Sequence, residues 1–470
     1  MNLKKGDVVE VVISDLAFGG EGVGKLKLPG GDFVVFVEDV APGDRVQARL
    51  FKIKKQFTQA KLVKILEPST QRITPRCKHF EICGGCTLQF FKYEDQLKWK
   101  EKIVKDALRQ IGGFGDIEIE PIIGCEDPWF YRNKMEYSFG FEDGATEPKK
   151  LALGLHPAGW FKSVFDLEEC FLQSPLAVKI VEATKTWARE QNLAPHDPRT
   201  NEGILKTLMI REGKNTNEMM VNLITNGRNF PQEKIFSDFI TKNFPEVTSL
   251  YRTAVTIQRG HRTVVEEFLL AGKPILTETL SVPKPDDQAK NTTLTFQIHP
   301  QAFFQTNTRQ AQVLYGKILE LAQPQQEDFV LDLFCGTGTI GMFFAKFSAK
   351  VAGVELNESA IQNAKENAKQ NDIANIDFFC GDVSNFLKTS SPPSILITDP
   401  PRAGIAPKTL QQILELKIPK WIYVSCNPST LARDLISMTK NGYQIKKIQP
   451  VDMFPHTYHI ETICLLQKTA

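Results

Sequence analysis

The fold of the C-terminal part of this chain is decided by the stretch Asp332-Leu333-Phe334-Cys335-Gly336-Thr337-Gly338-Thr339-Ile340-Gly341. An apolar run at 329–334 leads into it, and a helical pattern follows. A strand, a glycine-rich turn and a helix in this order are typical of sheets that bind nucleosides, because glycines let the backbone turn tightly and approach a ligand closely. The stretch therefore predicts a nucleoside cofactor at the carboxyl end of this strand.

The residues after 325 alternate regularly between short apolar runs and segments of helical length. The apolar runs are 329–334, 351–356, 378–380, 395–398 and 421–425. This alternation predicts a parallel, doubly wound α/β sheet. Two further β-like runs, 444–449 and 459–466, predict an antiparallel hairpin on the edge of that sheet.

Two carboxylates follow the next strands of the predicted sheet. Glu355 ends the second strand, 17 residues after Gly338, where a carboxylate can accept both ribose hydroxyls. Asp382 follows the third strand, where it can bind the adenine amino group. The glycine loop alone does not separate NAD from S-adenosylmethionine. However, Asp332 just before the turn and Phe334-Cys335 inside it suit a cofactor without a pyrophosphate.

The fourth and fifth strands end in Asp399-Pro400-Pro401-Arg402 and Ser425-Cys426-Asn427-Pro428. Ligands of open α/β sheets lie beyond the carboxyl ends of the strands, so Asp399 and Cys426 should face the same place. A lone cysteine is commonly a buried packing residue. The following turn favours a nucleophile instead, with a thiolate pKa lowered by local dipoles or by Arg402.

Glu461 begins the last predicted strand. It is either an exposed carboxylate on an edge strand or, beside Cys426, a general base. His456 and His459 are weaker candidates for proton transfer, and at least one of them is expected to be structural.

Residues 1–65 predict a small barrel of the OB type, because short β-branched runs alternate with glycine-rich turns such as 19–24. Five lysines gather in its last third: Lys52, Lys54, Lys55, Lys61 and Lys64. They are either a solvated strand face or a surface for an RNA backbone.

Three cysteines lie within ten residues, in the pattern Cys77-x5-Cys83-Gly84-Gly85-Cys86. A metal site needs a fourth ligand, and the spacing alone leaves an iron–sulfur cluster, structural zinc and a redox pair open. We expect the remaining cysteines to be small packing residues: Cys125, Cys335, Cys380 and Cys464.

Composition excludes several classes of protein. The chain has 470 residues, 42% of them hydrophobic and 24% charged, which is ordinary for globular domains. No segment approaches the roughly 18 consecutive apolar residues of a membrane helix, and no apolar run follows the basic N-terminus. We therefore expect a cytoplasmic protein whose thiols are reduced. The net charge of +2 means that nucleic-acid binding must use local basic patches.

In combination, these motifs resemble those of the RNA uracil-C5 methyltransferases, specifically the 23S ribosomal RNA enzymes with a TRAM domain and an iron–sulfur cluster. The resemblance covers nearly the whole chain. It also includes Phe303-Phe304-Gln305-Thr306-Asn307 and the stretch from Asp452 to Glu461. It implies a TRAM barrel at 1–66, an α+β middle domain at 67–300 that carries the cluster, and a Rossmann-like class I methyltransferase domain at 301–470.

The resemblance also implies roles for individual residues. It makes Cys426 the nucleophile and Glu461 the base that removes a proton. The S-adenosylmethionine site would be lined by Gln305, Phe334, Thr339, Glu355, Asp382 and Asp399, with Thr339 standing where some members have Asn. The ligands of a [4Fe-4S] cluster would be Cys77, Cys83, Cys86 and Cys170.

The implied reaction is methylation of uracil C5 after the Cys426 thiolate adds to C6. The implied partner of this monomer is 23S ribosomal RNA, because related transfer-RNA enzymes typically lack the barrel and the cluster. Three alternatives are a transfer-RNA uracil methyltransferase, a nicotinamide-dependent oxidoreductase that uses the glycine loop and the metal, and a noncatalytic RNA-binding protein. The joint presence of Asp399, Cys426 and Glu461 argues against the last.

Overall fold

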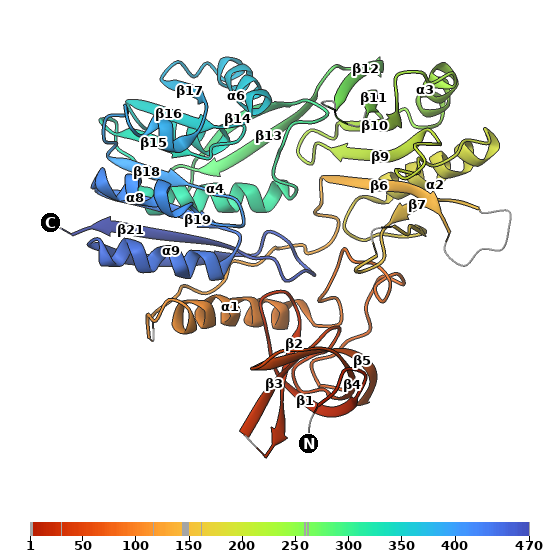
Figure 1. Cartoon of the computed structure of the whole chain (residues 1–470). Helices are drawn as coiled ribbons and strands as arrows, with labels where there is room; N and C mark the ends of the chain where they lie inside the picture. Colours follow the sequence, from red (N-terminus) through yellow and green to blue (C-terminus); the bar gives the residue numbers. More distant parts are fainter. Residues whose placement is uncertain are drawn as a thin grey trace.

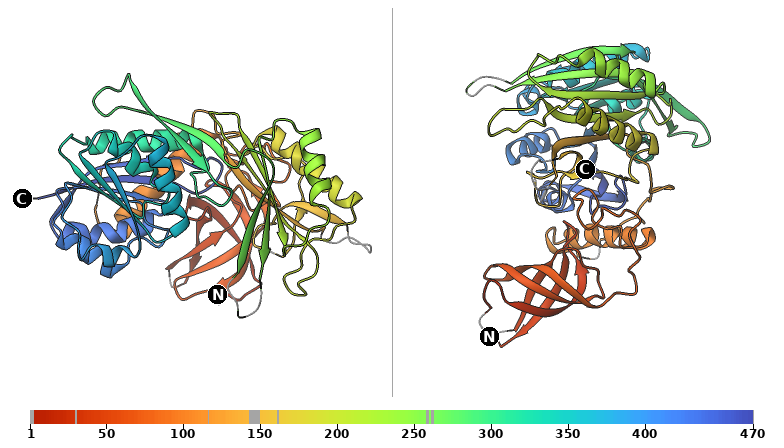
Figure 2. Two further views of the ribbon diagram at one scale, coloured as in Figure 1. Left: turned by 90° about the horizontal axis from the view of Figure 1, so that it is seen from above. Right: turned by 90° about the vertical axis from the view of Figure 1, so that its right-hand side faces the viewer.

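The computed structural model describes residues 3–469 except 30, 116, 143–149, 161, 258–259 and 261–262. Figure 1 shows a small N-terminal barrel below two larger α/β regions that lie side by side. In the side view of Figure 2 the barrel projects from the rest of the molecule, with the N-terminus at its far end.

The N-terminal strands form the predicted barrel, closed in the order β1-β2-β3-β5-β4. These strands are β1 (Val8–Leu16), β2 (Gly22–Leu28), β3 (Gly31–Val37), β4 (Arg45–Ile53) and β5 (Phe57–Glu67). Alternate side chains point inward, and Ile13, Val35 and Val46 are fully buried in the barrel core. Closure leaves no free strand edge in the barrel.

The glycine-rich stretch 19–24, predicted as a turn, instead runs into strand β2. A Cβ atom on Gly22 would lie 2.3 Å from Val40, and one on Gly24 would lie 2.3 Å from Val11. These two glycines are therefore required by close packing inside a strand, and the turn prediction was wrong for them.

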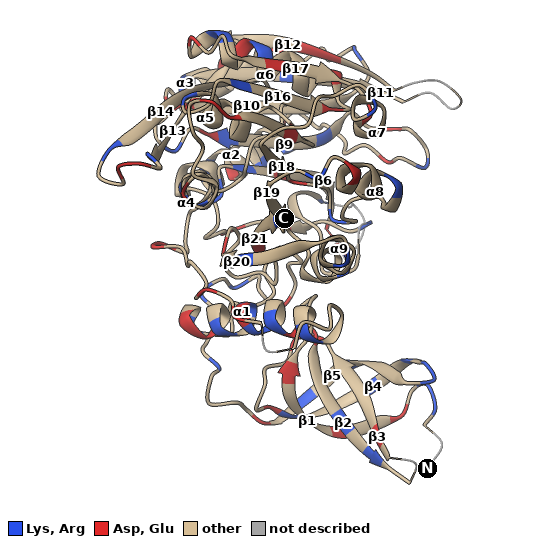
Figure 3. Ribbon diagram, turned by 90° about the vertical axis from the view of Figure 1, so that its left-hand side faces the viewer, with Lys and Arg blue, Asp and Glu red and all other residues tan. Residues whose placement is uncertain are grey.

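The five lysines of the predicted basic face are all exposed. They lie on and between β4 and β5, where Arg49 pairs with Lys61 and Lys52 with Gln59. Figure 3 shows Lys and Arg at several places on these strands, with Asp and Glu also present on the barrel. The lysines thus form a local basic patch on the barrel, in a chain whose net charge is only +2.

Helix α1 (Tyr93–Gln110) connects the barrel region to the C-terminal region (Figure 1). It packs against α9 (Pro428–Lys440), and its buried Val104 and Leu108 belong to the same apolar cluster as the α9 side chains. Lys100 lies on the buried face of α1, with no exposed surface, and donates to Asp452 Oδ1 at 2.6 Å. A helix near the start of the chain is therefore fixed to a loop near its end.

The middle region is a mixed sheet of seven strands within the described residues, in the order β12-β11-β10-β9-β6-β7-β8. The strands are β6 (Lys134–Phe141), β7 (Leu151–Leu155), β8 (Phe165–Asp166), β9 (Leu205–Glu212), β10 (Met219–Asn226), β11 (Ser249–Thr256) and β12 (Val264–Gly272). Helices α2 (Pro175–Glu190) and α3 (Glu233–Asn243) pack on it through a shared apolar core. This agrees with the α+β middle domain that the resemblance implies.

A two-stranded hairpin bridges the middle and C-terminal regions. Its strands β13 (Leu276–Pro283) and β14 (Asn291–Ile298) pack against α4 (Thr308–Ala322) and α6 (Glu358–Gln370). This hairpin precedes residue 301 but shares its apolar core with the C-terminal sheet described next. The predicted domain boundaries at residues 66 and 300 therefore remain proposals.

The C-terminal region is the predicted Rossmann-like sheet, in the order β17-β16-β15-β18-β19-β21-β20 within the described residues. Its strands are β15 (Phe329–Leu333), β16 (Lys350–Glu355), β17 (Ile376–Cys380), β18 (Ile395–Thr398), β19 (Lys420–Ser425), β20 (Tyr443–Val451) and β21 (Glu461–Lys468). Strands β15 to β19 are parallel, while β21 pairs antiparallel with β19 and β20. The hairpin of β20 and β21 therefore lies on the sheet edge, as predicted.

Helices cover both faces of this sheet. Side chains of α4, α5 (Thr339–Ala345) and α6 share one apolar cluster, and those of α8 (Pro407–Glu415) and α9 share another. The short helix α7 (Val383–Phe386) joins the second cluster through Val383. Among the described residues, no helix is both long and apolar enough to cross a membrane.

The buried ion pair between Lys100 and Asp452 predicts a large effect on stability. Lys100→Met should lower the free energy of unfolding by about 3–5 kcal/mol, because it leaves the Asp452 carboxylate buried without its counter-charge. Denaturant unfolding would measure the change. Lys98→Met is the matched control on the same helix: its ion pair with Asp95 is exposed, so stability should hardly change. Equal effects of the two variants would contradict the prediction.

Candidate functional site

The glycine loop turns sharply between β15 and α5. Gly336 and Gly338 have φ angles of 54° and 71°, and Phe334 also has a positive φ, of 63°. A Cβ atom on Gly338 would lie 2.4 Å from the ring of Phe378, so this glycine is required by packing. A Cβ atom on Gly336 would meet nothing within 4 Å. The backbone at Gly336 is therefore open to a ligand, as a cofactor loop requires.

Glu355 lies beside this loop, at the end of β16. Its carboxylate accepts the backbone N–H of Gly336 at 3.3 Å and that of Asn357 at 2.9 Å. Asp382 is exposed beyond β17 and caps α7 by accepting the N–H of Asn385. Both predicted carboxylates thus lie at the carboxyl ends of neighbouring parallel strands.

Asp332 is buried at the end of β15. Its Oδ2 accepts the N–H of Gly341 at 3.0 Å, while its Oδ1 has no hydrogen-bond partner among the described residues. Burial, with the nearby charges of Asp399 and Glu355, raises the pKa of Asp332 to about 8. An unpartnered buried carboxyl oxygen costs free energy, so this edge of the sheet is ready to accept a donor or a cation.

Asp399 follows β18, next to β15 in the sheet. Burial raises the pKa of Asp399 to about 7. Burial and the charge of Asp399 also raise the pKa of Glu461 well above its usual value, while Arg402 opposes this shift. The structure therefore gathers Asp332, Asp399 and Glu461 in one region of low polarity.

Cys426 and Glu461 lie next to the last residue pair of the β19–β21 ladder, Ser425 and Thr462. The charge of Glu461 acts on the Cys426 thiol, so the two side chains are neighbours. Burial, with the charges of Glu461 and Asp399, raises the pKa of the half-buried Cys426 thiol to about 11. Arg402 lowers this pKa, but the opposing effects are larger, so the prediction of a lowered thiol pKa was wrong.

The remaining predicted cofactor residues are Gln305 before α4, Thr339 at the start of α5 and Phe334 in the glycine loop. The segment that holds Gln305 precedes α4 and is tied to the middle region, because Asn133 Nδ2 donates to the Gln305 carbonyl at 2.8 Å. Thr339 is the buried first residue of α5, with its hydroxyl 3.4 Å from that of Thr337. Phe334 is half-buried inside the loop itself.

The two histidines of the loop between β20 and β21 differ in their surroundings. Burial, then the charge of Lys100, lowers the pKa of His456 to about 3. Burial, then the charge of Arg402, lowers the pKa of His459 to about 4. The His459 ring lies 3.3 Å from the Arg402 guanidinium, near the Cys426 side of the loop. These shifts oppose protonation of either ring near neutral pH.

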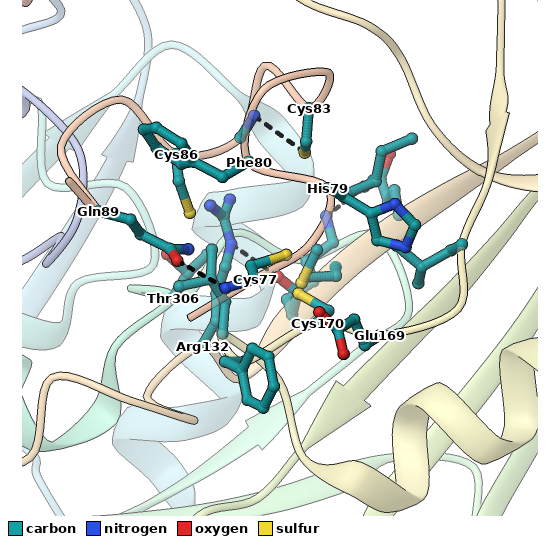
Figure 4. Close-up of a pocket in the computed structure, with 18 residues that line it drawn as sticks. Cys77, His79, Phe80, Cys83, Cys86, Gln89, Arg132, Glu169, Cys170 and Thr306 are labelled. Atoms are coloured by element: carbon teal, nitrogen blue, oxygen red, sulfur yellow. Dashed lines mark hydrogen bonds and ion pairs between the residues drawn. The ribbon is translucent and has the colours of Figure 1, made fainter. Parts of the chain in front are cut away.

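The four predicted metal ligands line a single cavity of about 360 Å³ (Figure 4). Burial raises the pKa of all four thiols, to about 11 for Cys83 and about 12 for Cys86. The charge of Cys170 raises the pKa of the other three further. Buried thiols that raise one another's pKa need a cation to become thiolates together.

The cavity also holds groups that can orient the cysteines. Gln89 accepts the N–H of Cys77 at 3.2 Å, and the Gly85 N–H donates to Cys83 Sγ at 3.3 Å. Arg132 lies on the same wall and lowers the pKa of Cys170. In the part of the chain that is described, no set of three or more His, Cys, Asp or Glu side chains is gathered closely enough to hold a metal ion.

The other cysteines do not all pack as predicted. Cys125 and Cys464 are buried and Cys335 is half-buried, but Cys380 is exposed at the end of the edge strand β17. The packing prediction was wrong for Cys380 because β17 has no strand on its outer side among the described residues.

Several residues near the site carried no signal in the sequence. Gln89 and Arg132 line the cysteine cavity, and Lys100 holds Asp452, yet none of them belongs to a motif. Lys100 looks like an ordinary helix residue. Its position on the buried face of α1 follows from helical spacing, but its partner lies 352 residues away.

Comparison with protein families identifies two segments. Residues 325–461 match the model of a methyltransferase domain, and residues 2–63 match the model of a TRAM domain. These segments correspond to most of the Rossmann-like sheet and to the barrel.

Relatives match over the whole chain. An uncharacterized RNA methyltransferase of Chlorobaculum tepidum is 36% identical over 99% of this chain and 97% of its own length. Another, of Caldanaerobacter subterraneus, is 37% identical over 99% of this chain and 100% of its own length. A crystal structure of a Pyrococcus abyssi tRNA (uracil-54, C5)-methyltransferase with S-adenosyl-L-homocysteine is 29% identical, with a TM-score of 0.72, and covers 97% of this chain and 100% of that one.

The glycine loop, the carboxylates at the strand ends and these full-length matches agree with one another. The chain belongs to the family of S-adenosylmethionine-dependent RNA methyltransferases.

Proposed function

We propose that this enzyme methylates C5 of a uridine in 23S ribosomal RNA through a covalent bond between Cys426 and C6 of the base. The observation that supports the proposal is that Cys426 directly follows the Ser425–Thr462 pair and that the charges of Glu461 and Asp399 both act on its thiol. A thiol nucleophile and a carboxylate base at one sheet edge are the two groups that this reaction needs.

The chemistry assigns one task to each residue. C5 of uracil is a poor nucleophile, but addition of the Cys426 thiolate to C6 moves electron density to C5 and O4. C5 then forms a bond to the methyl carbon that S-adenosylmethionine would supply; the bond between that carbon and sulfur breaks, its electron pair stays on sulfur, and S-adenosylhomocysteine would leave. Glu461 accepts the C5 proton, and the released electron pair restores the C5–C6 double bond and expels the Cys426 thiolate.

The cofactor would lie along the strand ends, over Gly336. We assign its binding to Gln305, Phe334, Thr339, Glu355, Asp382 and Asp399. The free space above Gly336 supports this assignment, since a Cβ atom there would meet no neighbour within 4 Å. Glu355 is held at the loop by two backbone N–H groups, in a position suited to ribose hydroxyls.

The target base must leave its stack to reach Cys426. The barrel supplies exposed lysines that can hold an RNA backbone nearby, and Phe18 of the barrel contacts Tyr458 of the loop before Glu461, with ring centroids 5.8 Å apart. The barrel is thus placed to present RNA to the edge of the catalytic sheet.

We further propose that Cys77, Cys83, Cys86 and Cys170 hold a [4Fe-4S] cluster. All four cysteines line one cavity, which supports this proposal, and cluster binding would draw their thiols closer together than they lie in this structure. Structural zinc is the alternative, because it also binds four cysteines. The methylation steps need no electron, so the cluster's role here would be structural.

A transfer-RNA substrate is the second candidate. The archaeal enzyme named for tRNA uracil methylation matches 97% of this chain, which includes most of the barrel. The barrel therefore does not distinguish the two RNA classes, and the proposal of ribosomal RNA rests on the proposed cluster. The covalent adduct described next separates these candidates directly.

Glu461→Gln should trap RNA on the enzyme. Glutamine keeps the shape but cannot accept the C5 proton, so the methylated adduct should persist, with turnover lowered by about 10²–10⁴-fold. Denaturing gels of the variant mixed with total cellular RNA would show the adduct, and sequencing would identify the bound RNA. We expect 23S ribosomal RNA linked at a uracil.

The double variant Glu461→Gln, Cys426→Ala is the control for this experiment and should form no adduct. Normal turnover of Glu461→Gln without trapped RNA would refute Glu461 as the base. Recovery of transfer RNA in the adduct would instead favour the second candidate.

Alkylation of Cys426 in the free enzyme should be slow and depend steeply on pH. The raised thiol pKa, about 11, means that the reactive thiolate increases about tenfold per pH unit below that value. Arg402→Ala removes a charge that lowers this pKa and should slow the reaction at fixed pH. Mass spectrometry of the labelled peptide would measure the rates, with Cys426→Ser as the unlabelled control. A rate independent of pH from about 7 to 9 would contradict the prediction.

Protein purified without oxygen should be brown and contain about four iron atoms per chain. Cys83→Ser should lose the colour and most of the iron, because Cys83 lines the cavity. Cys380→Ser is the matched control, since Cys380 is exposed and belongs to a different region. Stoichiometric zinc without iron would decide for a structural zinc site.

A further inference from the structure

His456 has a strained backbone in the loop between β20 and β21. Its φ angle is 66° although it is not a glycine, and only 3% of its surface is exposed. Such a conformation costs about 1–3 kcal/mol and persists where the surroundings fix it, commonly at functional sites. His456 lies five residues before Glu461, so whatever fixes it also fixes the approach to the proposed base.

The neighbours of His456 hold it on every side. Gln96 of α1 accepts its backbone N–H at 2.9 Å and lies 3.1 Å from its ring Nδ1. Its carbonyl accepts the N–H groups of Thr87 at 2.8 Å and Leu88 at 3.0 Å. Its ring stacks on Trp129 with centroids 3.8 Å apart. Gln96 has no exposed surface, so these contacts are shielded from water.

The same two segments hold both ends of the loop. Lys100 donates to Asp452 and to the Phe454 carbonyl, at 2.6 and 3.0 Å. Thr87 Oγ1 accepts the N–H of Tyr458 at 3.1 Å. Residues of α4 and its N-terminus also bond to the start of the loop, since Asn307 donates to the Met453 carbonyl and Gln310 to the Asp452 carbonyl. The side-chain and backbone bonds to His456 and Tyr458 come from α1 and from the short segment directly after Cys86.

Proton transfer by His456 itself does not explain these contacts. Burial lowers its pKa to about 3, and its Nε2 is buried with no hydrogen-bond partner within the described residues. The ring is thus a neutral packing group. The strain is instead located where it can direct the chain into β21, which begins at Glu461.

We propose that Gln96 and Thr87 are positioning residues that hold the loop 452–458 so that Glu461 meets the proton on C5 of the target base. The inference rests on the proposed function, since it takes Glu461 as the base. Because Thr87 directly follows Cys86, order in the cysteine segment is transmitted to the base through the Thr87–His456 and Thr87–Tyr458 hydrogen bonds.

Gln96→Leu removes both side-chain contacts with His456. We expect kcat to fall about 10- to 100-fold, because a shift of about 1 Å in a reacting group has effects of this size. The KM for RNA and the affinity for S-adenosylhomocysteine should stay within about twofold of wild type, because neither ligand is held by this loop in the proposal. Gln96→Glu should recover part of kcat, since it keeps an acceptor for the His456 N–H.

Asn375→Leu is the matched control. It also removes a side-chain amide with two hydrogen bonds, to the carbonyls of Ala345 and Ser348, but at the start of β17, on the opposite edge of the sheet. It should leave kcat unchanged. An equal fall in kcat for Asn375→Leu would show that loss of stability, rather than positioning, lowers the rate.

If Gln96→Leu does not fold, Thr87→Val tests the same idea, since it keeps the backbone donors and removes the hydroxyl that holds Tyr458. Thr87→Ser should then restore the rate. Amide hydrogen exchange of the peptide 452–461 provides a readout apart from activity: exchange should be faster in Gln96→Leu and Thr87→Val than in Asn375→Leu. Wild-type kcat and wild-type exchange in the first two variants would overturn the proposal.

A double variant separates this proposal from the proposed function. In Glu461→Gln, adding Gln96→Leu should cause no further fall in the rate of adduct resolution, because the base is already absent. An additional fall of tenfold or more would show that Gln96 acts elsewhere. If Glu461→Gln turns over normally, the base assignment fails and this proposal fails with it. If Glu461→Gln traps RNA but Gln96→Leu is silent, the positioning proposal alone fails.

Discussion

Three carboxyl groups, those of Asp332, Asp399 and Glu461, crowd one edge of the catalytic sheet, and much of the site depends on how their charge is balanced. Burial raises the pKa of each one, and neighbouring carboxylates raise it further for Asp332 and Glu461. Such an edge favours a cationic ligand over an anionic one. S-adenosylmethionine carries a positive sulfonium, whereas a nicotinamide dinucleotide carries a negative pyrophosphate. Electrostatics thus separates two cofactors that the glycine loop alone does not.

The charges of Asp399 and Glu461 also raise the pKa of Cys426, the proposed nucleophile. The Cys426 thiol has a raised pKa because it is partly buried and faces Glu461 and Asp399, with Arg402 as the opposing charge. A cation bound beside Asp399 would reduce this repulsion, so cofactor binding and thiolate formation are coupled through charge. A thiol with such a raised pKa reacts slowly in the free protein, which limits its alkylation and oxidation.

Features encoded locally could be predicted from the sequence, and features that depend on distant contacts could not. The strand, loop and helix around Gly336 follow from a contiguous pattern, and the hairpin at the sheet edge from two adjacent β-like runs. Gly22 and Gly24 were mistaken for turn residues, because their close contacts with Val40 and Val11 come from other parts of the barrel. The partnership of α1 with the loop before Glu461 joins residues more than 350 positions apart. No local pattern records it.

The cysteine cavity adjoins two segments of the proposed site. Thr306 lines the cavity and is the neighbour of Gln305 in the proposed cofactor site, while Thr87, next to Cys86, holds the loop that leads to Glu461. A metal cluster in this cavity would therefore order both segments at once. Such a cluster need not transfer an electron to affect methylation, because loss of its ligands would loosen the cofactor side and the base side of the same site together.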